Sequence, residues 1–224
     1  MNKFVTQFGK NWTYRTSGPT EYNVFWEQGL NGGGTYFGTE YPEVIKVLYP
    51  NHTFKRCLEW CSGPGFIGFN IMSHNLCKNL TLVDLYHPAL NKVKETIEYN
   101  NLQEKVDFYK SSTIKDLKST HKFDLIVANP PHYDKISKDG NDSRILDDVD
   151  WEIHKEFYEN IGFHMADDGV ILIQENEDGS KPEYFYDMIQ KNNLKVVNVI
   201  KSPNHYGNHI HTKIYYLQVV KNNN

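Results

Sequence analysis

The sequence predicts an α/β fold of the Rossmann-like kind, with a seven-stranded, mostly parallel sheet, an antiparallel last strand and helices on both faces. Three observations predict it. From residue 56 onward, strand patterns alternate with helix patterns, which is the order of repeated βα units in a parallel sheet. Residues 123–128, FDLIVA, form an unbroken apolar run, as buried parallel strands do. The connection between the last two strand patterns is too short for a crossover helix, so the last strand is expected to run antiparallel.

The expected elements follow from the apolar spacing along the chain. Strands are expected in short runs rich in β-branched and aromatic residues, at 57–61, 80–84, 106–109, 123–128, 170–174, 194–200 and 213–220. Helices are expected where apolar residues recur at helical spacing, at 66–76, 89–100, 151–165 and 182–190. A further helix is expected at 40–49, after a capping residue at Thr39. Residues 1–38 are expected to form an extension without a core of its own, which leaves the α/β domain at 39–224.

Length and composition limit the class of protein. The chain has 224 residues, of which 39% are hydrophobic and 23% charged, as in one soluble domain with a short appendage. No apolar run approaches the roughly 18 residues of a membrane span, and Met1–Lys10 lack the apolar stretch of a signal peptide. Three cysteines are too few for a disulfide framework. These features predict a cytoplasmic protein without a membrane partner.

A glycine-rich turn follows the first expected strand of the α/β domain. Residues 57–68, CLEWCSGPGFIG, place Gly63, Gly65 and Gly68 in G-x-G-x-x-G spacing between a strand and a helix. Such a turn lets the backbone approach a ligand and presents the free N–H groups of a helix N-terminus. Asp84 ends the next strand about 20 residues on, where a carboxylate accepts hydrogen bonds from ribose hydroxyls. Helix–strand packing for Gly68 and an ordinary strand-end cap for Asp84 stay open as alternatives.

The glycine spacing suits NAD as well as S-adenosylmethionine (SAM), and Glu59 separates the two. Glu59 lies near the end of the first strand, four residues before Gly63. A charge in a buried parallel strand is costly unless it has a partner. The cationic part of SAM would be such a partner, whereas the diphosphate of NAD is anionic, which disfavours an NAD(P) oxidoreductase. The alternative is an ion pair between Glu59 and a neighbouring lysine or arginine.

Two consecutive prolines follow the apolar run at 123–128. In Asn129-Pro130-Pro131 they fix an extended backbone and remove two N–H donors. The remaining carbonyls and the Asn129 amide oxygen are acceptors, and they leave the carboxyl end of a central strand, where open α/β sheets bind ligands. A rigid set of acceptors suits an NH2 group with two hydrogens to place. A plain strand-ending turn is the alternative.

These motifs together resemble those of a known family. CLEWCSGPG at 57–65, LVD at 82–84 and FDLIVANPPHY at 123–133 are similar to motifs of class I SAM-dependent methyltransferases with an Asn-Pro-Pro-aromatic signature. That group includes enzymes that methylate adenine N6, guanine N2 and protein glutamine N5. FGTEYPEVIKVL at 37–48 resembles the Gly-Thr-Asp/Glu segment before the glycine loop in the small-domain branch. The resemblance covers roughly 37–175 and implies fold, cofactor and nitrogen chemistry.

Carried over residue by residue, the resemblance implies a SAM site. The expected cofactor-binding residues are Thr39, Glu59, Cys61, Gly63, Gly65, Asp84, Ser112 and Asn129. Glu59 and the two glycines of the turn would hold the methionine part, Asp84 the ribose, and Thr39 would lie near the cofactor. Cys61 stands where the family usually has glycine, and Ser112 belongs to a Ser-Ser pair where an acid near the adenine is usual.

The resemblance also implies the substrate side. Asn129 and the Pro130 carbonyl would hold the target NH2 and stabilise the positive charge that develops on it. Pro131, His132 and Tyr133 would contact the substrate. His132 stands where Tyr or Phe is usual, and stacking, hydrogen bonding and proton acceptance all stay open for it. The expected catalytic residues are Asn129, Pro130 and His132.

The predicted function is SAM-dependent in-line transfer of a methyl group to a planar exocyclic amino or amide nitrogen, most readily of a nucleic-acid base. The short N-terminal extension favours a base, which would be unpaired or flipped out, whereas the net charge of −4 gives no global basic field. Protein-glutamine N5 methylation and a catalytically silent SAM-binding regulator are the alternatives. RNA, DNA and protein substrates are not separated, and the oligomeric state is undetermined.

Three further groups of polar residues are expected to hold no metal. Cys57 and Cys61 would lie on the same face of a strand, as core cysteines rather than ligands. The segment 205–211, HYGNHIH, is expected to be a polar loop on the catalytic side. The loop 134–150 carries six aspartates and is expected to be either solvated or a lid over the substrate.

Overall fold

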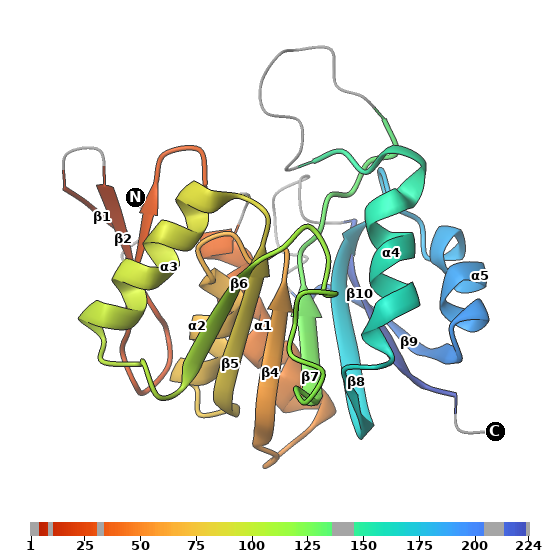
Figure 1. The fold of residues 1–224 in the computed structure, drawn as a ribbon, viewed down its shortest axis with the longest axis horizontal. Helices are drawn as coiled ribbons and strands as arrows, with labels where there is room; N and C mark the ends of the chain where they lie inside the picture. The colour runs from red at the N-terminus through yellow and green to blue at the C-terminus, as the bar shows by residue number, and fades with distance from the viewer. Residues whose placement is uncertain (1–4, 9–10, 31–33, 136–145, 204–212, 223–224) are drawn as a thin grey trace. The chain divides into compact units, whose positions relative to one another are not determined.

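The computed structural model describes residues 5–8, 11–30, 34–135, 146–203 and 213–222. The chain divides into two compact units, Met1–Ser112 and Thr113–Asn224 (Figure 1). Each unit contains part of the strand–helix alternation that the sequence predicts. The division into an extension at 1–38 and a domain at 39–224 stays a prediction.

The first unit contains three parallel strands in the order β6-β5-β4. The strands are β4 (Phe54–Trp60), β5 (Cys77–Asp84) and β6 (Val106–Lys110). The helices are α1 (Gly34–Leu48), α2 (Phe66–Ser73) and α3 (His87–Tyr99). Buried apolar residues such as Leu58, Leu80 and Leu82 fill the strands. Because β4 and β5 pair in parallel, their carboxyl ends lie together at one edge of the sheet.

Helix α1 begins earlier than the sequence predicts. Thr39 is not a cap but lies within α1, where its Oγ1 donates a hydrogen bond to the carbonyl of Tyr36 at 2.7 Å. The reason is close packing between α1 and α2: a Cβ on Gly38 would lie 2.8 Å from the Phe66 carbonyl oxygen. The glycine at position 38 therefore serves a tight helix–helix contact, which stabilises the first turns of α1.

A small antiparallel sheet precedes α1 in the order β1-β2-β3. Its strands are β1 (Val5–Phe8), β2 (Asn11–Arg15) and β3 (Asn23–Glu27). The ring of Trp26 lies 5.8 Å from that of Phe66 in α2, and the ring of Phe25 lies 5.2 Å from that of Tyr99 in α3. The aromatic residues of the N-terminal segment therefore pack on the helices of this unit.

The second unit contains four strands in the order β7-β8-β10-β9. The strands are β7 (Phe123–Ala128), β8 (Met165–Asn176), β9 (Leu194–Lys201) and β10 (Ile214–Lys221). The helical segments are η2 (Val149–Trp151), α4 (Glu152–Ile161) and α5 (Glu183–Lys191). Strand β7 runs parallel to β8, and β10 runs antiparallel to both β8 and β9. The antiparallel last strand is thus confirmed, with helices around a mostly parallel sheet.

The predicted helix at 151–165 is wrong at its end. Helix α4 stops at Ile161, and Met165 already belongs to β8, where it pairs with Phe123. The Phe123 N–H donates to the His164 carbonyl at 2.7 Å, so the sheet captures residues that helical spacing alone would assign to the helix. No helix among the described residues is long and apolar enough to cross a membrane.

Candidate functional site

The glycine turn of the first unit joins β4 to α2 through left-handed backbone. Cys61, Gly63 and Gly65 have φ values of 53°, 49° and 85°. Only glycine adopts this region without cost, which explains why a glycine is usual at the position of Cys61. Cys61 lies in the turn beyond β4, so the prediction that Cys57 and Cys61 share a strand face is wrong. No group of His, Cys, Asp or Glu that could hold a metal occurs among the described residues.

Asp84 holds the glycine turn against the end of β5. Its Oδ2 accepts a hydrogen bond from the Gly63 N–H at 2.7 Å, and its Oδ1 accepts one from the Tyr86 N–H at 2.7 Å. Burial raises the pKa of Asp84, and these N–H groups oppose that rise. Each carboxylate oxygen has a second lone pair. The carboxylate is therefore both a cap for the turn and an acceptor still able to bind a ligand hydroxyl.

Glu59 is a buried acid near the end of β4. Its side chain is 2% exposed, and its Oε2 accepts a hydrogen bond from the Gly68 N–H at 2.7 Å. Burial raises the pKa of Glu59 to about 8, although the N–H groups of Gly68 and Ile67 oppose the rise. Within the described residues, Glu59 forms no ion pair. The alternative of a lysine or arginine partner thus finds no support in this part of the chain.

The Glu59 carboxyl and the Leu80 side chain leave no room for a side chain at Gly68. A Cβ at this position would lie 2.7 Å from Glu59 Oε2 and 2.6 Å from Leu80 Cδ1. Both distances are too short for a methyl group. The packing alternative for Gly68 is therefore correct, and the same close approach brings its N–H to the acid.

Two other expected cofactor residues lie on elements of the same unit. Thr39 is half-buried on α1, with its hydroxyl bonded inside the helix. Ser112 is exposed just beyond β6, whose last residue, Lys110, pairs with Asp84 of β5. Ser112 therefore follows the same sheet edge as Asp84. Contacts of Thr39 and Ser112 with a cofactor stay predictions.

In the second unit, the Asn-Pro-Pro segment follows β7. Pro130 and Pro131 are buried and Asn129 is half-buried. The N–H groups of His132 and Tyr133 both donate to the Leu146 carbonyl, at 3.0 and 2.9 Å. Residues beyond the two prolines are therefore held in place by backbone bonds from a distant part of the chain.

A glycine on the β8–α5 connection also closes on this segment. A Cβ on Gly179 would lie 2.2 Å from the His132 carbonyl oxygen and 2.4 Å from Tyr133 Cδ1. No larger residue fits there without moving His132 or Tyr133. His132 and Tyr133, which follow the Asn-Pro-Pro segment, are thus held on two sides, as residues of a binding segment should be.

The structure adds residues that the sequence analysis missed. His132 Nδ1 lies 3.1 Å from Glu175 Oε2, and Glu175 Oε1 lies 2.8 Å from His154 Nε2. His154 Nδ1 lies 2.6 Å from Asp148 Oδ2. The sequence signal was the acid in the apolar strand VILIQEN. Asp148 was expected in a solvated loop or lid, but it is 1% exposed.

In this row of buried side chains, two carboxyl groups and a histidine carry the charge. Burial acts to lower the pKa of His154, but the carboxylates of Glu175 and Asp148 outweigh it and raise that pKa to about 9. Burial acts to raise the pKa of Glu175, but His154 and His132 bring it below the ordinary value. Near neutral pH, His154 is therefore protonated and donates from both ring nitrogens.

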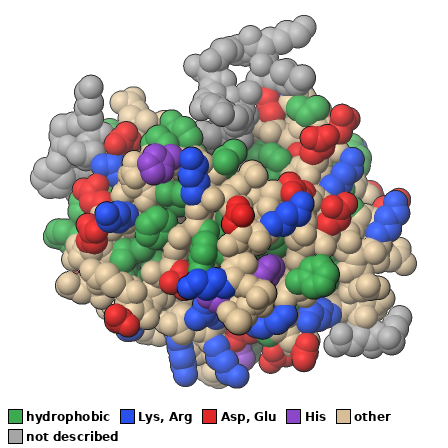
Figure 2. All heavy atoms as spheres, in the orientation of Figure 1, with side chains coloured by type: hydrophobic (Ala, Val, Ile, Leu, Met, Phe, Trp, Pro, Cys, Tyr) green, Lys and Arg blue, Asp and Glu red, His purple; other side chains and the backbone are tan. Residues whose placement is uncertain are grey.

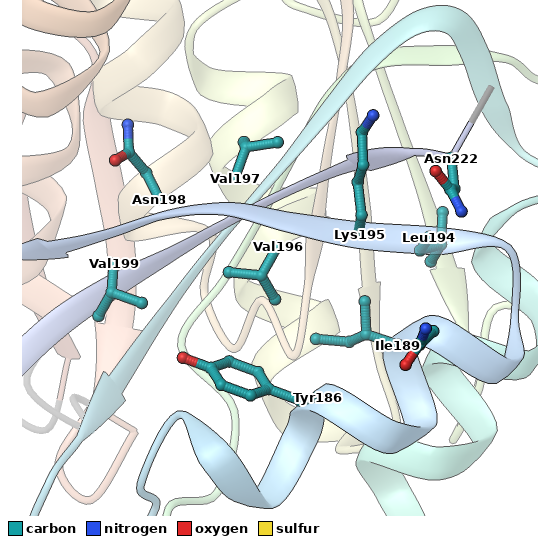
Figure 3. Close-up of a pocket in the computed structure, with 10 residues that line it drawn as sticks. Tyr186, Ile189, Leu194, Lys195, Val196, Val197, Asn198, Val199 and Asn222 are labelled. Carbon is teal, nitrogen blue, oxygen red and sulfur yellow. The ribbon is translucent and has the colours of Figure 1, made fainter. Parts of the chain in front are cut away.

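The described residues also form a surface hollow that is separate from the residues of the candidate site. A surface hollow of about 470 Å³ lies between α5 and β9, where Tyr186 and Ile189 face Val196 (Figure 3). It contains none of the predicted site residues. The predicted loop 205–211 lies outside the described residues. On the face drawn in Figure 2, Lys and Arg side chains are interspersed with Asp and Glu, so surface charge there does not choose between a nucleic-acid and a protein substrate.

The sequence is similar to a known family and to proteins whose names state an activity. Residues 42–147 match the methyltransferase small domain family. The chain is 34% identical over 116 residues to the ribosomal protein uL3 glutamine methyltransferase of Francisella tularensis, covering 51% of this chain and 33% of that protein. It is 29% identical over 164 residues to ribosomal RNA small subunit methyltransferase C of Haemophilus influenzae, covering 70% of this chain and 45% of that protein. The chain thus spans less than half of these curated relatives.

The fold has solved counterparts. A 16S rRNA N2 methyltransferase of T. Thermophilus, solved in complex with AdoMet and guanosine, matches with a TM-score of 0.65 and 13% identity. The match covers 96% of this chain and 52% of that chain. At this identity the likeness concerns the fold, and it confirms the predicted Rossmann-like α/β class.

Proposed function

Because the chain belongs to the class I SAM-dependent methyltransferases, we propose that it methylates a planar exocyclic nitrogen, most readily the amino group of a nucleic-acid base. The electrophilic methyl group is what SAM supplies when bound. The residues of this chain bind the cofactor, orient the target nitrogen and receive its proton.

Glu59 is the observation that carries the proposal. It is a buried carboxyl with its pKa raised to about 8 and, among the described residues, no cation beside it. A ligand that brings a positive charge lowers that pKa and is held by the ionised acid. The amino group and sulfonium of SAM meet this need, whereas an anionic diphosphate would oppose ionisation. The residues of the turn therefore fit SAM better than NAD.

The remaining cofactor contacts follow from the turn and the strand ends. Asp84, whose carboxylate lies at the turn with acceptor capacity beyond its backbone bonds, would accept a ribose hydroxyl. Gly63 and Gly65 would let the backbone approach the methionine part, with Cys61 beside them. Thr39, Ser112 and Asn129 complete the proposed set, with Asn129 directed mainly to the target nitrogen, so that loss of its side chain leaves SAM affinity nearly intact.

Asn129 and the Pro130 carbonyl would orient the target NH2. An exocyclic nitrogen is a weak nucleophile because its lone pair is delocalised, and positive charge grows on it during methyl transfer. Fixed acceptors stabilise that charge. Anchoring of His132 and Tyr133 to Leu146 supports this role, since acceptors that move lose their advantage. Pro131, His132 and Tyr133 would contact the substrate.

Protein glutamine is the second candidate substrate. Its side-chain amide presents the same planar NH2, and the relative of Francisella tularensis named as a glutamine methyltransferase is 34% identical over the matched residues. Both named relatives act on ribosomal RNA or ribosomal protein, so a ribosomal substrate and a cytoplasmic location form part of the proposal.

Incubation with methyl-labelled SAM and separate pools of RNA, DNA and cell protein tests the function. Label recovered as a base methylated on its exocyclic nitrogen supports the first substrate class, and label recovered as N5-methylglutamine supports the second. The matched control is Asn129→Ala, which should bind SAM and transfer little label. SAM binding without transfer to any pool would indicate a silent regulator. NAD binding without SAM binding would overturn the proposal.

A further inference from the structure

A buried relay of ionisable side chains ends at His132 in the second unit. It runs from Asp148, before η2, through His154 of α4 to Glu175 of β8 and then to His132. His154 and Glu175 are at most 1% exposed, whereas the His132 side chain is 12% exposed. His132 is therefore the one end of this relay that a substrate could reach.

Both carboxylate oxygens of Glu175 have hydrogen-bond partners. Oε1 receives the His154 Nε2–H, and Oε2 lies 3.1 Å from His132 Nδ1 and accepts the Ser180 hydroxyl at 2.6 Å. The Ser180 carbonyl is in turn bonded by the Tyr215 hydroxyl at 2.7 Å. An ionised Glu175 can only accept, so the proton between it and His132 must lie on Nδ1.

Asp148 holds His154 in the same manner. Its Oδ1 accepts the Ile153 N–H at 2.9 Å, and its Oδ2 lies 2.6 Å from His154 Nδ1. The Phe185 ring stacks on His154 with centroids 4.7 Å apart. His154 is thus fixed between two carboxylates, and its charge keeps Glu175 ionised. Tyr158 of α4 and Tyr215 of β10 also face Glu175, and burial followed by its charge raises the pKa of both phenols.

A purely structural role does not account for this arrangement. Buried ion pairs are often no more stabilising than apolar residues of similar size, and three ionised groups in a row cost desolvation. What the relay gives is a fixed tautomer: with Nδ1 protonated, His132 Nε2 keeps its lone pair. The same logic governs imidazole bases oriented by a carboxylate.

We propose that Glu175 fixes His132 as the Nδ1–H tautomer, so that His132 Nε2 takes the proton released by the methylated nitrogen, with His154 and Asp148 as positioning residues. This inference rests on the proposed function. As the nitrogen–carbon bond forms and the carbon–sulfur bond of SAM breaks, one N–H proton of the target amino group passes to His132 Nε2. The products are the neutral methylated amine, the neutral thioether left from SAM, and an imidazolium that releases its proton to solvent.

Glu175→Gln is the central test, because the amide keeps the shape and removes the charge. In wild type, the rate should rise with pH until the base is deprotonated. Without the carboxylate the imidazolium is less stable, so the acidic limb of the pH–rate profile should move to lower pH. The matched control is His164→Gln, which alters another buried histidine, bonded at Nδ1 to the His121 carbonyl at 3.2 Å, and should leave the profile in place. An unmoved limb in folded Glu175→Gln overturns the inference.

A second variant and a spectroscopic measurement complete the test. His132→Phe keeps an aromatic ring but no base, and should lose the acidic limb and about a hundredfold in rate. Nitrogen NMR of histidine-labelled wild type, recorded at a pH above the acidic limb, should show His132 protonated at Nδ1 and bare at Nε2, and Glu175→Gln should reduce that preference. The NMR result does not depend on activity. The opposite tautomer in wild type overturns the inference alone, whereas absence of SAM binding and transfer would overturn the proposed function with it.

Discussion

The raised pKa of Glu59 predicts that SAM affinity depends on pH. In the free protein the carboxyl titrates with a pKa of about 8, and a bound cation should hold it ionised. Binding therefore releases a proton. The apparent Kd should fall about tenfold per pH unit below 8, and about 25-fold from pH 6.0 to 7.5, or about 2 kcal/mol. Across this range the amino group of the ligand itself stays mostly protonated.

Calorimetry in two buffers of different ionisation enthalpy measures the linkage directly. At pH 7 about 0.9 proton should leave per SAM bound, given a pKa of about 8 in the free protein. The control variant is Glu59→Gln, whose amide oxygen still accepts the Gly68 N–H but does not titrate. Its affinity should be weaker and flat across the range. Equal, pH-independent binding by both proteins with no proton release would show that Glu59 does not bind the cationic part of SAM.

The same shift makes a prediction for stability. A carboxyl whose pKa rises from 4.5 to about 8 on folding binds more protons in the folded state than in the unfolded state between those values. The free energy of unfolding therefore falls as pH rises from 4.5 to 8. At pH 7 the loss is about 3 kcal/mol, so Glu59→Gln should unfold at higher urea than wild type at pH 7 and with little advantage at pH 4.5. A Gln variant less stable than wild type at pH 7 would contradict the assignment.

Substitutions at three further positions test single contacts. Asp84→Ala should weaken SAM binding by about 1.5–3 kcal/mol in calorimetry, and unchanged affinity in a folded variant would remove Asp84 from the site. Gly68→Ala should lower the free energy of unfolding by about 1–3 kcal/mol, because its Cβ would lie 2.7 Å from Glu59 Oε2. Urea titration measures this loss, and an unchanged free energy of unfolding would show that the contact relaxes. Asn129→Ala should keep SAM affinity and lower turnover about a hundredfold, whereas Asn129→Asp should retain partial activity. If Asn129→Ala turns over like wild type, the Asn-Pro-Pro segment is only a strand-ending turn.

Features that depend on the order of residues within a few consecutive elements could be predicted from the sequence alone. The apolar run at 123–128 coincides with β7, because a strand buried on both faces leaves an unbroken hydrophobic pattern. The glycine turn, with Glu59 before it and Asp84 at the next strand end, could be predicted because in consecutive parallel βα units the turn after one strand lies beside the end of the next strand. The short last connection likewise required β10 to be antiparallel.

Features that join residues far apart along the chain could be found only in the folded structure. The end of α4 and the start of β8 were set by pairing of Met165 with Phe123, which outweighs helical spacing. His132, His154 and Glu175 are separated by about 20 residues each along the chain, and no periodicity relates them. They meet because β7 and β8 are adjacent and α4 packs beside them, so a buried ionisable relay that the sequence shows as scattered polar residues exists only once the fold has formed.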